Sequence, residues 1–240
     1  MDMVKSNKIN SIVHLAGILS ALGEKNVDLS VDVNVTGVIN AMRAAQANNS
    51  RIFVPTSISV FGGEHFPKVN TPVDVVLQPK TIYGVAKVFN EMIGDYYKRK
   101  FNMDFRALRY PVVISSEKFA FNGTAAYSTE IFFEALENRY YKCPLAERTT
   151  LPMIYIDDCI DATVRYLKAD PARLKRHVYN LAGIPVTTGD LCSAVQRLIP
   201  GLRVDYVPDF RQQIADSWPD SVDDSDSLRD WDWSYNISTF

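Results

Sequence analysis

With 240 residues and a net charge of -2, the chain is long enough for one large domain or a domain with a lobe, and its charge does not suggest binding to nucleic acid or to an acidic membrane surface. Its 47% hydrophobic and 22% charged residues are typical of a globular protein, and no apolar run approaches the roughly 20 residues of a membrane-spanning helix. Cys143, Cys159 and Cys192 are odd in number and lack metal-ligand spacing, which favours free thiols in a reducing compartment over a secreted disulfide framework.

Along the chain, apolar strand-like runs alternate with segments of helical periodicity. The first part predicts, in chain order, a strand at 12–15, a helix at 31–48, a strand at 52–54, a helix at 81–100 and a strand at 105–109. The second part predicts a helix at 127–138, a strand at 153–156, a helix capped by Asp157 or Asp158 and ending near Lys168, a strand at 178–181, and a helix capped by Thr187 or Thr188 and ending near Leu198. The acidic stretch 216–232 is expected to be rich in loops. This alternation predicts βαβ units and a mostly parallel sheet.

The most informative motif is the pair Tyr83 and Lys87, four residues apart and therefore on one face of the predicted helix 81–100. A nearby positive charge favours the phenolate form of tyrosine, and a tyrosine tuned in this way can act as a general base. Lowering the phenol pKa from about 10 to about 7 needs roughly 4 kcal/mol. One partly exposed lysine rarely supplies that much, so a second cation is needed, and an oxidised nicotinamide ring would serve.

The residues upstream strengthen this interpretation. The strand predicted at 52–54 runs into Pro55-Thr56-Ser57, which places hydroxyl groups at its carboxyl end. Active sites of open α/β sheets lie at the carboxyl ends of strands. Pro79 then stands just before the helix that carries Tyr83 and Lys87, where proline is tolerated. A strand-end hydroxyl followed by this helix is far more specific than the Tyr–Lys spacing alone.

The chain resembles an extended short-chain dehydrogenase/reductase. The resemblance rests on the order of Val13-His14-Leu15-Ala16-Gly17, Asn34-Val35-Thr36-Gly37, Ser57 ahead of Gly62, Tyr83 with Lys87, and Arg109-Tyr110-Pro111. Within that superfamily it is most similar to the short-chain type of L-threonine 3-dehydrogenase, through the runs 16–21, 81–84, 109–111, 151–158 and 214–219. The resemblance implies an α/β, Rossmann-like, mostly parallel sheet with a smaller C-terminal substrate lobe. Residues 1–114, with 153–182 returning to them, would form the partial dinucleotide-binding domain, and residues 115–152 and 183–240 the lobe.

The resemblance also implies catalytic roles. Tyr83 would be the general base, Lys87 would lower its pKa and bond the nicotinamide ribose, and Ser57 would orient the substrate hydroxyl. Thr56 would replace Ser57 if the alignment slipped by one residue. Asn34, expected to open a helix, would either order a water chain behind Lys87 or simply bond the backbone.

The binding residues follow from the same resemblance. The expected NAD contacts are Leu15, Ala16, Gly17, Tyr83, Lys87, Tyr110, Pro111 and Val113. The expected substrate contacts are Ser20, Ser57, Thr81, Tyr83, Gly123, Thr124 and Trp218. No metal site is apparent, and none of His14, His65 and His177 is assigned to catalysis.

One feature of that superfamily is missing. No G-x-G-x-x-G run occurs in the sequence, and Gly62-Gly63 follows the wrong strand for the pyrophosphate loop. By resemblance, the first strands of the fold and their helices are therefore absent from this sequence, as is a last helix. Either the sequence is part of a longer protein, or it is a shortened relative that cannot hold NAD in the usual way. The first interpretation is favoured, because an exposed half-sheet would present unpaired backbone.

The expected function is the NAD-dependent oxidation of L-threonine to 2-amino-3-oxobutanoate by a homodimer in the mitochondrial matrix or cytoplasm, not secreted, with no nucleic-acid or membrane partner. One alternative is a nucleotide-sugar epimerase or dehydratase, for which Arg139, Lys142, Arg148 and Arg211 would have to hold a diphosphate. The other is an inactive relative that acts as a binding module.

Overall fold

The computed structural model describes residues 6–63, 66–117 and 123–236. Its main sheet has five strands, all parallel, in the order β1-β2-β4-β3 with β8 on the other side of β4. These strands are β1 (Ser11–Val13), β2 (Arg51–Phe53), β3 (Thr56–Ser57), β4 (Phe105–Tyr110) and β8 (Val178–Asn180). The prediction of a mostly parallel α/β sheet is confirmed.

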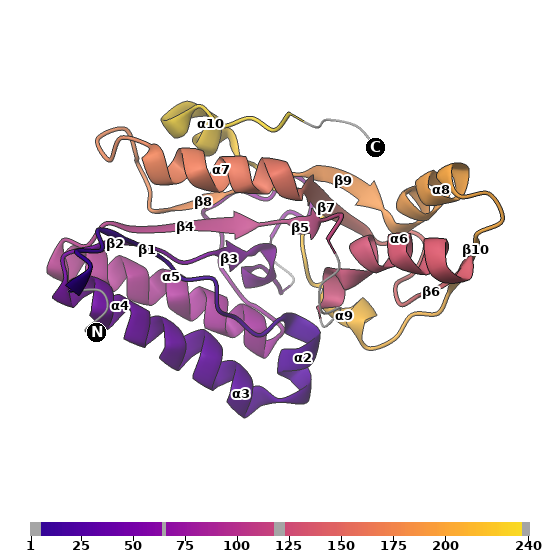
Figure 1. The fold of residues 1–240 in the computed structure, drawn as a ribbon, viewed down its shortest axis with the longest axis horizontal. Coiled ribbons are helices and arrows are strands. Elements are labelled where there is room, and N and C mark those ends of the chain that lie inside the picture. Colours follow the sequence, from indigo (N-terminus) through magenta and orange to yellow (C-terminus); the bar gives the residue numbers. More distant parts are fainter. Residues whose placement is uncertain (1–5, 64–65, 118–122, 237–240) are drawn as a thin grey trace.

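Helices cover both faces of this sheet (Figure 1). One face carries a nearly continuous helical segment and the long helix α5, which bury apolar side chains such as Val38, Met42 and Ile52 between them and the sheet. The helical segment consists of α3 (Val27–Val31), a π-helical turn η1 (Asp32–Thr36) and α4 (Gly37–Ala47), and α5 spans Ile82–Phe101. The other face carries α7 (Ile156–Lys168) and α10 (Ser225–Trp231) over a cluster that includes Phe53, Tyr166 and Trp231.

The rest of the chain forms a smaller lobe beside the carboxyl ends of the main strands (Figure 1). A second sheet pairs β5 with β7 in parallel and β7 with β9 antiparallel, and a third pairs β6 with β10 in parallel. Its strands are β5 (Val112–Ile114), β6 (Tyr140–Cys143), β7 (Thr150–Tyr155), β9 (Ile184–Thr187) and β10 (Arg203–Tyr206). Its helices are α6 (Tyr127–Asn138), α8 (Thr188–Leu198) and α9 (Arg211–Asp216), with the short 3-10 turn η3 (Thr124–Ala126). The short helix α2 (Ser20–Lys25) packs against α3 and α5, and the 3-10 turn η2 (Ile58–Val60) packs against α5.

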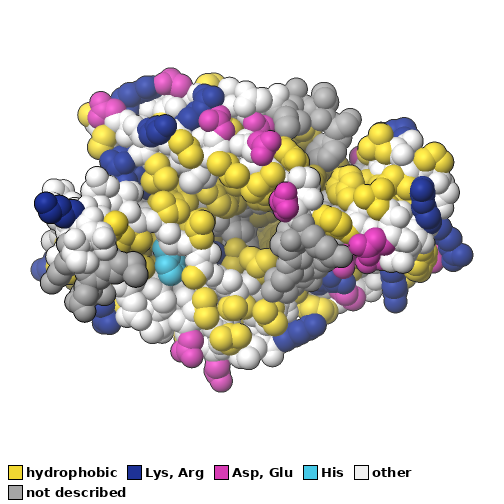
Figure 2. Space-filling view, viewed as in Figure 1, with side chains coloured by type: hydrophobic (Ala, Val, Ile, Leu, Met, Phe, Trp, Pro, Cys, Tyr) yellow, Lys and Arg dark blue, Asp and Glu magenta, His cyan; other side chains and the backbone are white. Residues whose placement is uncertain are grey.

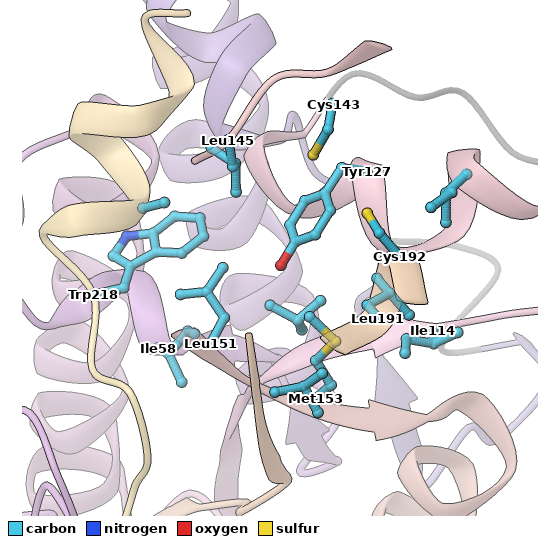
Figure 3. Close-up of a cluster of buried hydrophobic side chains, with 14 of the residues drawn as sticks. Ile58, Ile114, Tyr127, Cys143, Leu145, Leu151, Met153, Leu191, Cys192 and Trp218 are labelled. Atoms are coloured by element: carbon cyan, nitrogen blue, oxygen red, sulfur yellow. The ribbon is translucent and has the colours of Figure 1, made fainter. Parts of the chain in front are cut away.

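The lobe has its own hydrophobic core (Figure 3). Tyr127 of α6 lies among Cys143, Leu145, Leu151, Met153 and Cys192, and Trp218 packs at the side of the cluster near Ile58. Because Ile58 follows directly from β3, this core extends to the end of the main sheet. Packing of the lobe therefore fixes the position of the strand end that carries Ser57.

The structure corrects several boundaries. Strand β1 ends at Val13, so Leu15 lies beyond it, and α7 begins at Ile156 with Tyr155 at the N-cap and no side-chain capping bond. The prediction that Asp157 or Asp158 caps this helix is therefore wrong, because both lie inside its first turn, where a carboxylate is favoured by the helix dipole.

Of the two candidate caps of α8, the structure selects Thr187, whose hydroxyl accepts from Asp190 N at 2.9 Å. The stretch 216–232 is less loop-rich than expected, since it contains α10. Within the described part of the chain, no helix is both long and apolar enough to cross a membrane.

Candidate active site

A cavity of about 380 Å³ opens where the carboxyl ends of β3 and β4 meet the lobe. It is lined by Leu15, Gly17, Leu19, Ser20, Pro55, Thr56, Ser57, Ile58, Tyr83, Lys87, Tyr110, Pro111, Val112, Val113, Gly123, Thr124, Ala125, Ala126 and Trp218. The space-filling view shows hydrophobic side chains around a hollow near the centre of one face of the molecule (Figure 2). Most of the lining is apolar, so a ligand there would be largely withdrawn from water.

Helix α5 brings Tyr83 and Lys87 into this cavity. The helix starts where it does because Thr81 caps it, its hydroxyl accepting from Gly84 N at 3.0 Å. Tyr83 and Lys87 then lie one turn apart, and Lys87 Nζ is 5.3 Å from the centre of the Tyr83 ring. The ammonium also donates to the carbonyl of Pro55 at 2.6 Å, which ties it to the end of the neighbouring strand.

Ser57 lies at the end of β3, beside Tyr83. Its Oγ accepts from Ser59 N at 3.2 Å, which caps the η2 turn, and the Ser57 hydroxyl lies close enough to Tyr83 to lower the pKa of that phenol. Thr56 reaches the cavity too, but its hydroxyl donates to the Leu108 carbonyl at 3.3 Å. Of the two hydroxyls that the sequence left open, that of Ser57 acts on the pKa of Tyr83, whereas that of Thr56 is directed to the Leu108 carbonyl.

Burial dominates the electrostatics of the pair. It raises the pKa of Tyr83 to about 12, with the hydrogen bond from Ser57 acting in the opposite direction. Burial lowers the pKa of Lys87 to about 8, and the negative charge of Glu91 opposes that shift. Without a second cation the phenol therefore stays protonated, because the cost of burying a phenolate outweighs the effect of one ammonium, and the role of Lys87 in lowering the pKa of Tyr83 stays a prediction.

Asn34 lies in a different setting from the one expected. It does not open a helix but lies inside the π-helical turn η1, where it is buried. Its side-chain amide is hydrogen-bonded to the backbone of Ile18. Asn34 Oδ1 accepts from Ile18 N at 2.8 Å, and Asn34 Nδ2 donates to Ile18 O at 2.9 Å. This contact holds the loop that follows β1, which carries Leu15 and Gly17 along the cavity. A role in a water chain stays a prediction.

Most of the expected cofactor contacts come together at the cavity. Leu15, Gly17, Tyr83, Lys87, Tyr110, Pro111 and Val113 line it, whereas Ala16 does not. Tyr110 is anchored from the other face of the sheet, since its hydroxyl is 2.5 Å from that of Thr163. Burial, first of all, raises the pKa of Tyr110 far above its ordinary value, so its phenol stays neutral.

The expected substrate contacts converge in the same way, with one exception. Ser20, Ser57, Tyr83, Gly123, Thr124 and Trp218 line the cavity. Thr81 is outside its lining, and its hydroxyl serves as the helix cap. Ser20 and Thr124 bond each other, since Ser20 Oγ donates to Thr124 Oγ1 at 2.9 Å and accepts from Thr124 N at 3.1 Å.

Sequence reasoning missed several residues of the lining: Leu19, Ile58, Val112, Ala125 and Ala126. It also missed the Pro55 carbonyl as the anchor of Lys87, since a backbone contact leaves no trace in the residue types. The histidines remain unassigned to catalysis, and His65 lies outside the described residues. Among residues 6–63, 66–117 and 123–236, no group of three or more His, Cys, Asp or Glu side chains is arranged to hold a metal ion.

Comparison with known proteins places this geometry in a family. The chain is 41% identical over 237 residues to the mitochondrial L-threonine 3-dehydrogenase of Bos taurus, an alignment that covers 98% of this chain and 63% of the relative's length. The L-threonine dehydrogenase structure from Phytophthora infestans superposes with a TM-score of 0.94 at 41% identity, covering 98% of this chain and 76% of that one. The apo structure described as a monomeric L-threonine 3-dehydrogenase from a metagenome gives a TM-score of 0.95 at 39% identity, with coverage of 98% and 76%.

The model of the NAD dependent epimerase/dehydratase family matches residues 1–182, about three quarters of the 240 residues. The Ser57, Tyr83 and Lys87 constellation lies inside that match. The chain belongs to the NAD dependent epimerase/dehydratase family.

Proposed function

We propose that this chain oxidises the β-hydroxyl of L-threonine to 2-amino-3-oxobutanoate with NAD. One observation carries the proposal: Ser57, Tyr83 and Lys87 converge on a single cavity, with the Lys87 ammonium beside the Tyr83 ring and bonded to the strand end at Pro55. The names of the bovine, Phytophthora and metagenome relatives support threonine as the substrate.

One part of the cavity lining, formed by Tyr110, Pro111, Val113 and Gly17, fits the nicotinamide end of the cofactor. Tyr110, Pro111 and Val113 offer an apolar surface for a flat ring, and Gly17 permits a close approach of backbone. Lys87 has three N–H donors, and the bond to Pro55 uses one of them, which leaves donors for a ribose hydroxyl. When bound, the oxidised nicotinamide supplies a hydride acceptor and a positively charged ring.

Tyr83 Oη is the proposed acceptor of the substrate's hydroxyl proton. Ser57 Oγ, which lines the same cavity beside Tyr83, would hold the reacting oxygen in position. Bringing the pKa of Tyr83 from about 12 to about 7 takes roughly 7 kcal/mol, so the ammonium of Lys87 has to act together with a further positive charge. In the low dielectric of this cavity each positive charge acts more strongly than it would in water.

Another part of the lining, which includes Ser20, Gly123, Thr124 and Trp218, suits a small zwitterion. Hydroxyls of Ser20 and Thr124 can receive an ammonium group, and the backbone N–H of Gly123 can donate to a carboxylate, whereas the N–H of Thr124 is already bonded to Ser20 Oγ. Trp218, only 5% exposed, closes this end against water.

A nucleotide-sugar substrate fits less well. Its diphosphate needs basic side chains, and among the described residues of the lining Lys87 alone is charged. Arg139, Lys142, Arg148 and Arg211, which that alternative would use, are not part of the lining. Calorimetric titration with NAD distinguishes an inactive binding module from the enzyme.

The finer properties belong to the same proposal. From the family we also propose that the cofactor is NAD in preference to NADP, that the chain forms a homodimer, and that it is located in the mitochondrial matrix or the cytoplasm. We further propose that the chain divides into two units, residues 1–114 with 153–182 and residues 115–152 with 183–240. Supporting the division, β8 returns to pair with β4 while α6 and α8 pack together in the lobe.

The test is threonine-dependent formation of NADH by the purified 240-residue chain, with NADP and L-serine as comparison cofactor and substrate. Binding is measured separately by calorimetric titration with NAD. Binding and turnover together support the proposal. A folded chain that binds no NAD at millimolar concentration favours the binding module. Protection from proteolysis by a UDP-sugar, with none by threonine and NAD, favours the epimerase alternative.

A further inference from the structure

A buried ion pair lies next to the site, and the proposed chemistry does not use it. Arg109 of β4 and Glu91 of α5 form two hydrogen bonds, Nε to Oε1 at 2.9 Å and Nη2 to Oε2 at 2.7 Å. Their side chains are only 6% and 7% exposed. A buried ion pair is weak as a source of stability, because desolvating both charges costs about what their attraction returns. Its position relative to Lys87 offers a functional reason for it.

Glu91 continues the row that Tyr83 and Lys87 begin. The three residues are spaced by four along α5, so each lies one turn beyond the last on the same face. Lys87 and Glu91 are both buried in the interior between α5 and the sheet. In that environment a carboxylate one helical turn away acts on the ammonium with little screening by water.

Arg109 holds the side chain of Glu91 in place. Its guanidinium also donates to the Val73 carbonyl at 2.9 Å and lies 5.1 Å from the centre of the Phe61 ring. These contacts fix the guanidinium, so the Glu91 carboxylate that it binds stays beside the face of α5 that carries Tyr83 and Lys87. Without Arg109, the carboxylate of Glu91 would be buried with no guanidinium to bind it.

The other charged or titratable groups around Lys87 do not provide the same effect. Tyr83 is neutral, since burial raises its pKa to about 12. His14 faces Lys87 from beyond β1, and burial followed by the charge of Lys87 lowers the pKa of His14, so it too is neutral. Asp95, one turn beyond Glu91, bonds Arg99 and lies 3.6 Å from His177. Among the described residues, Glu91 is the one that opposes the loss of charge at Lys87.

We propose that Glu91, held by Arg109, is the counter-ion that keeps the ammonium of Lys87 charged beside Tyr83. This is a positioning role, because Glu91 is not part of the cavity lining. It rests on the proposed function in that a charged Lys87 matters only if Tyr83 must lose a proton during turnover.

The first measurement does not depend on turnover. Titration of 13Cε-labelled lysine followed by NMR, with Lys87→Arg used to assign the signal, gives the pKa of Lys87 directly. Glu91→Gln is expected to lower that pKa by roughly one unit. Asp95→Asn, one turn further along α5, is the matched control and is expected to leave it unchanged.

The second measurement is the pH dependence of kcat. A one-unit shift from about 8 predicts that Glu91→Gln loses about fivefold at pH 8 and less than twofold at pH 6.5. If Glu91→Gln does not fold because Arg109 is left unpaired, the double variant Glu91→Gln with Arg109→Gln removes both charges, and the same direction of shift is expected.

The two proposals can fail separately. An unshifted Lys87 titration in both the single and the double variant overturns the role of Glu91, even if threonine is oxidised. A loss of kcat that is uniform across pH overturns it as well, since that is the mark of a merely structural residue. A shifted titration in a chain that never oxidises threonine supports the coupling and refutes the proposed function.

Discussion

Lys87 Nζ lies 5.3 Å from the centre of the Tyr83 ring while donating a 2.6 Å hydrogen bond to the carbonyl of Pro55. The ammonium is thus fixed from two sides, by its own helix and by the end of the strand that leads to Ser57. With a side chain this buried, the position of the charge is determined by packing and not by solvent. Four predictions follow from this arrangement and its supports.

Replacing Tyr83 by Phe is expected to lower kcat for threonine oxidation by 10²-fold or more, since a general base contributes about 10² to 10⁴. NAD affinity should change little, because the ring and the neighbouring Lys87 remain. Steady-state kinetics and a cofactor titration check this. Tyr96→Phe, on the same helix but 47% exposed, is the control and should turn over normally. Retention of more than a tenth of kcat in Tyr83→Phe would remove Tyr83 as the base.

Replacing Lys87 by Met is expected to abolish turnover yet stabilise the fold near neutral pH. The pKa of Lys87 is about 8 in the folded chain and about 10.4 when unfolded, so at pH 7 its burial costs roughly 3 kcal/mol. The lost bond to Pro55 offsets about 1 kcal/mol, which leaves a net gain of about 2 kcal/mol.

The sign of the pH dependence follows from the same shift. Between pH 8 and about 10.4 the unfolded chain binds more protons at Lys87 than the folded chain does, so the unmodified protein gains stability as the pH rises. The advantage of Lys87→Met should therefore shrink over that range. Urea unfolding at several pH values measures it, with the exposed Lys100→Met as control. A difference that is independent of pH would contradict the assignment of this charge to the buried side chain.

Replacing Ser57 by Ala is expected to lower kcat by roughly 10²-fold, because the hydroxyl that lowers the pKa of Tyr83 and would orient the reacting oxygen is lost. Thr56→Val is the matched variant. It removes the neighbouring hydroxyl, which bonds the Leu108 carbonyl instead, and should cost about 1 kcal/mol of stability with little loss of kcat. The reverse pattern would move the role to Thr56, the alternative that the sequence left open.

The sequence predicted the parts of the site that depend on local spacing. The row of Tyr83 and Lys87 follows from helix geometry, and the place of Ser57 follows from the end of a buried apolar strand. The structure brings both onto one cavity as expected. The predicted helix 127–138 coincides with α6, because its apolar spacing matches a helix that is half-buried in the core of the lobe.

What the sequence could not predict depends on burial and on backbone contacts. The spacing of Tyr83 and Lys87 suggested a lowered phenol pKa, but how deeply α5 packs decides the sign, and the pKa of Tyr83 is raised to about 12. Likewise the sequence predicted a capping role for Asn34. Only the tertiary structure shows that its side chain is hydrogen-bonded to the backbone of Ile18 from inside a π-helical turn. The Glu91–Arg109 pair joins residues 18 apart through a contact between helix and strand, which no local pattern reveals.

Gly84 provides the last prediction, because it sets the distance between α5 and the turn after Ser57. A Cβ at this position would lie 2.3 Å from the carbonyl oxygen of Ser59 and 2.7 Å from Pro79 Cβ. Gly84→Ala must therefore push the start of α5 away from η2, despite the better helix propensity of alanine. We expect a loss of about 2 kcal/mol or more in the free energy of unfolding, together with a fall in kcat.

Gly37→Ala is the matched control for Gly84→Ala. A Cβ at Gly37 would meet only the Asp32 carbonyl oxygen at 3.7 Å, an ordinary contact, so alanine there should stabilise the helix by about 0.5 to 1 kcal/mol. Denaturant unfolding and threonine kinetics on the two variants separate the effects. The clash at Gly84 displaces the helix that carries Tyr83 from the turn that follows Ser57. Gly84→Ala should therefore reduce kcat more than it reduces NAD affinity. Equal stability of the two variants would mean that α5 is free to shift against η2, and that the contact between Tyr83 and Ser57 is set by some other part of the fold.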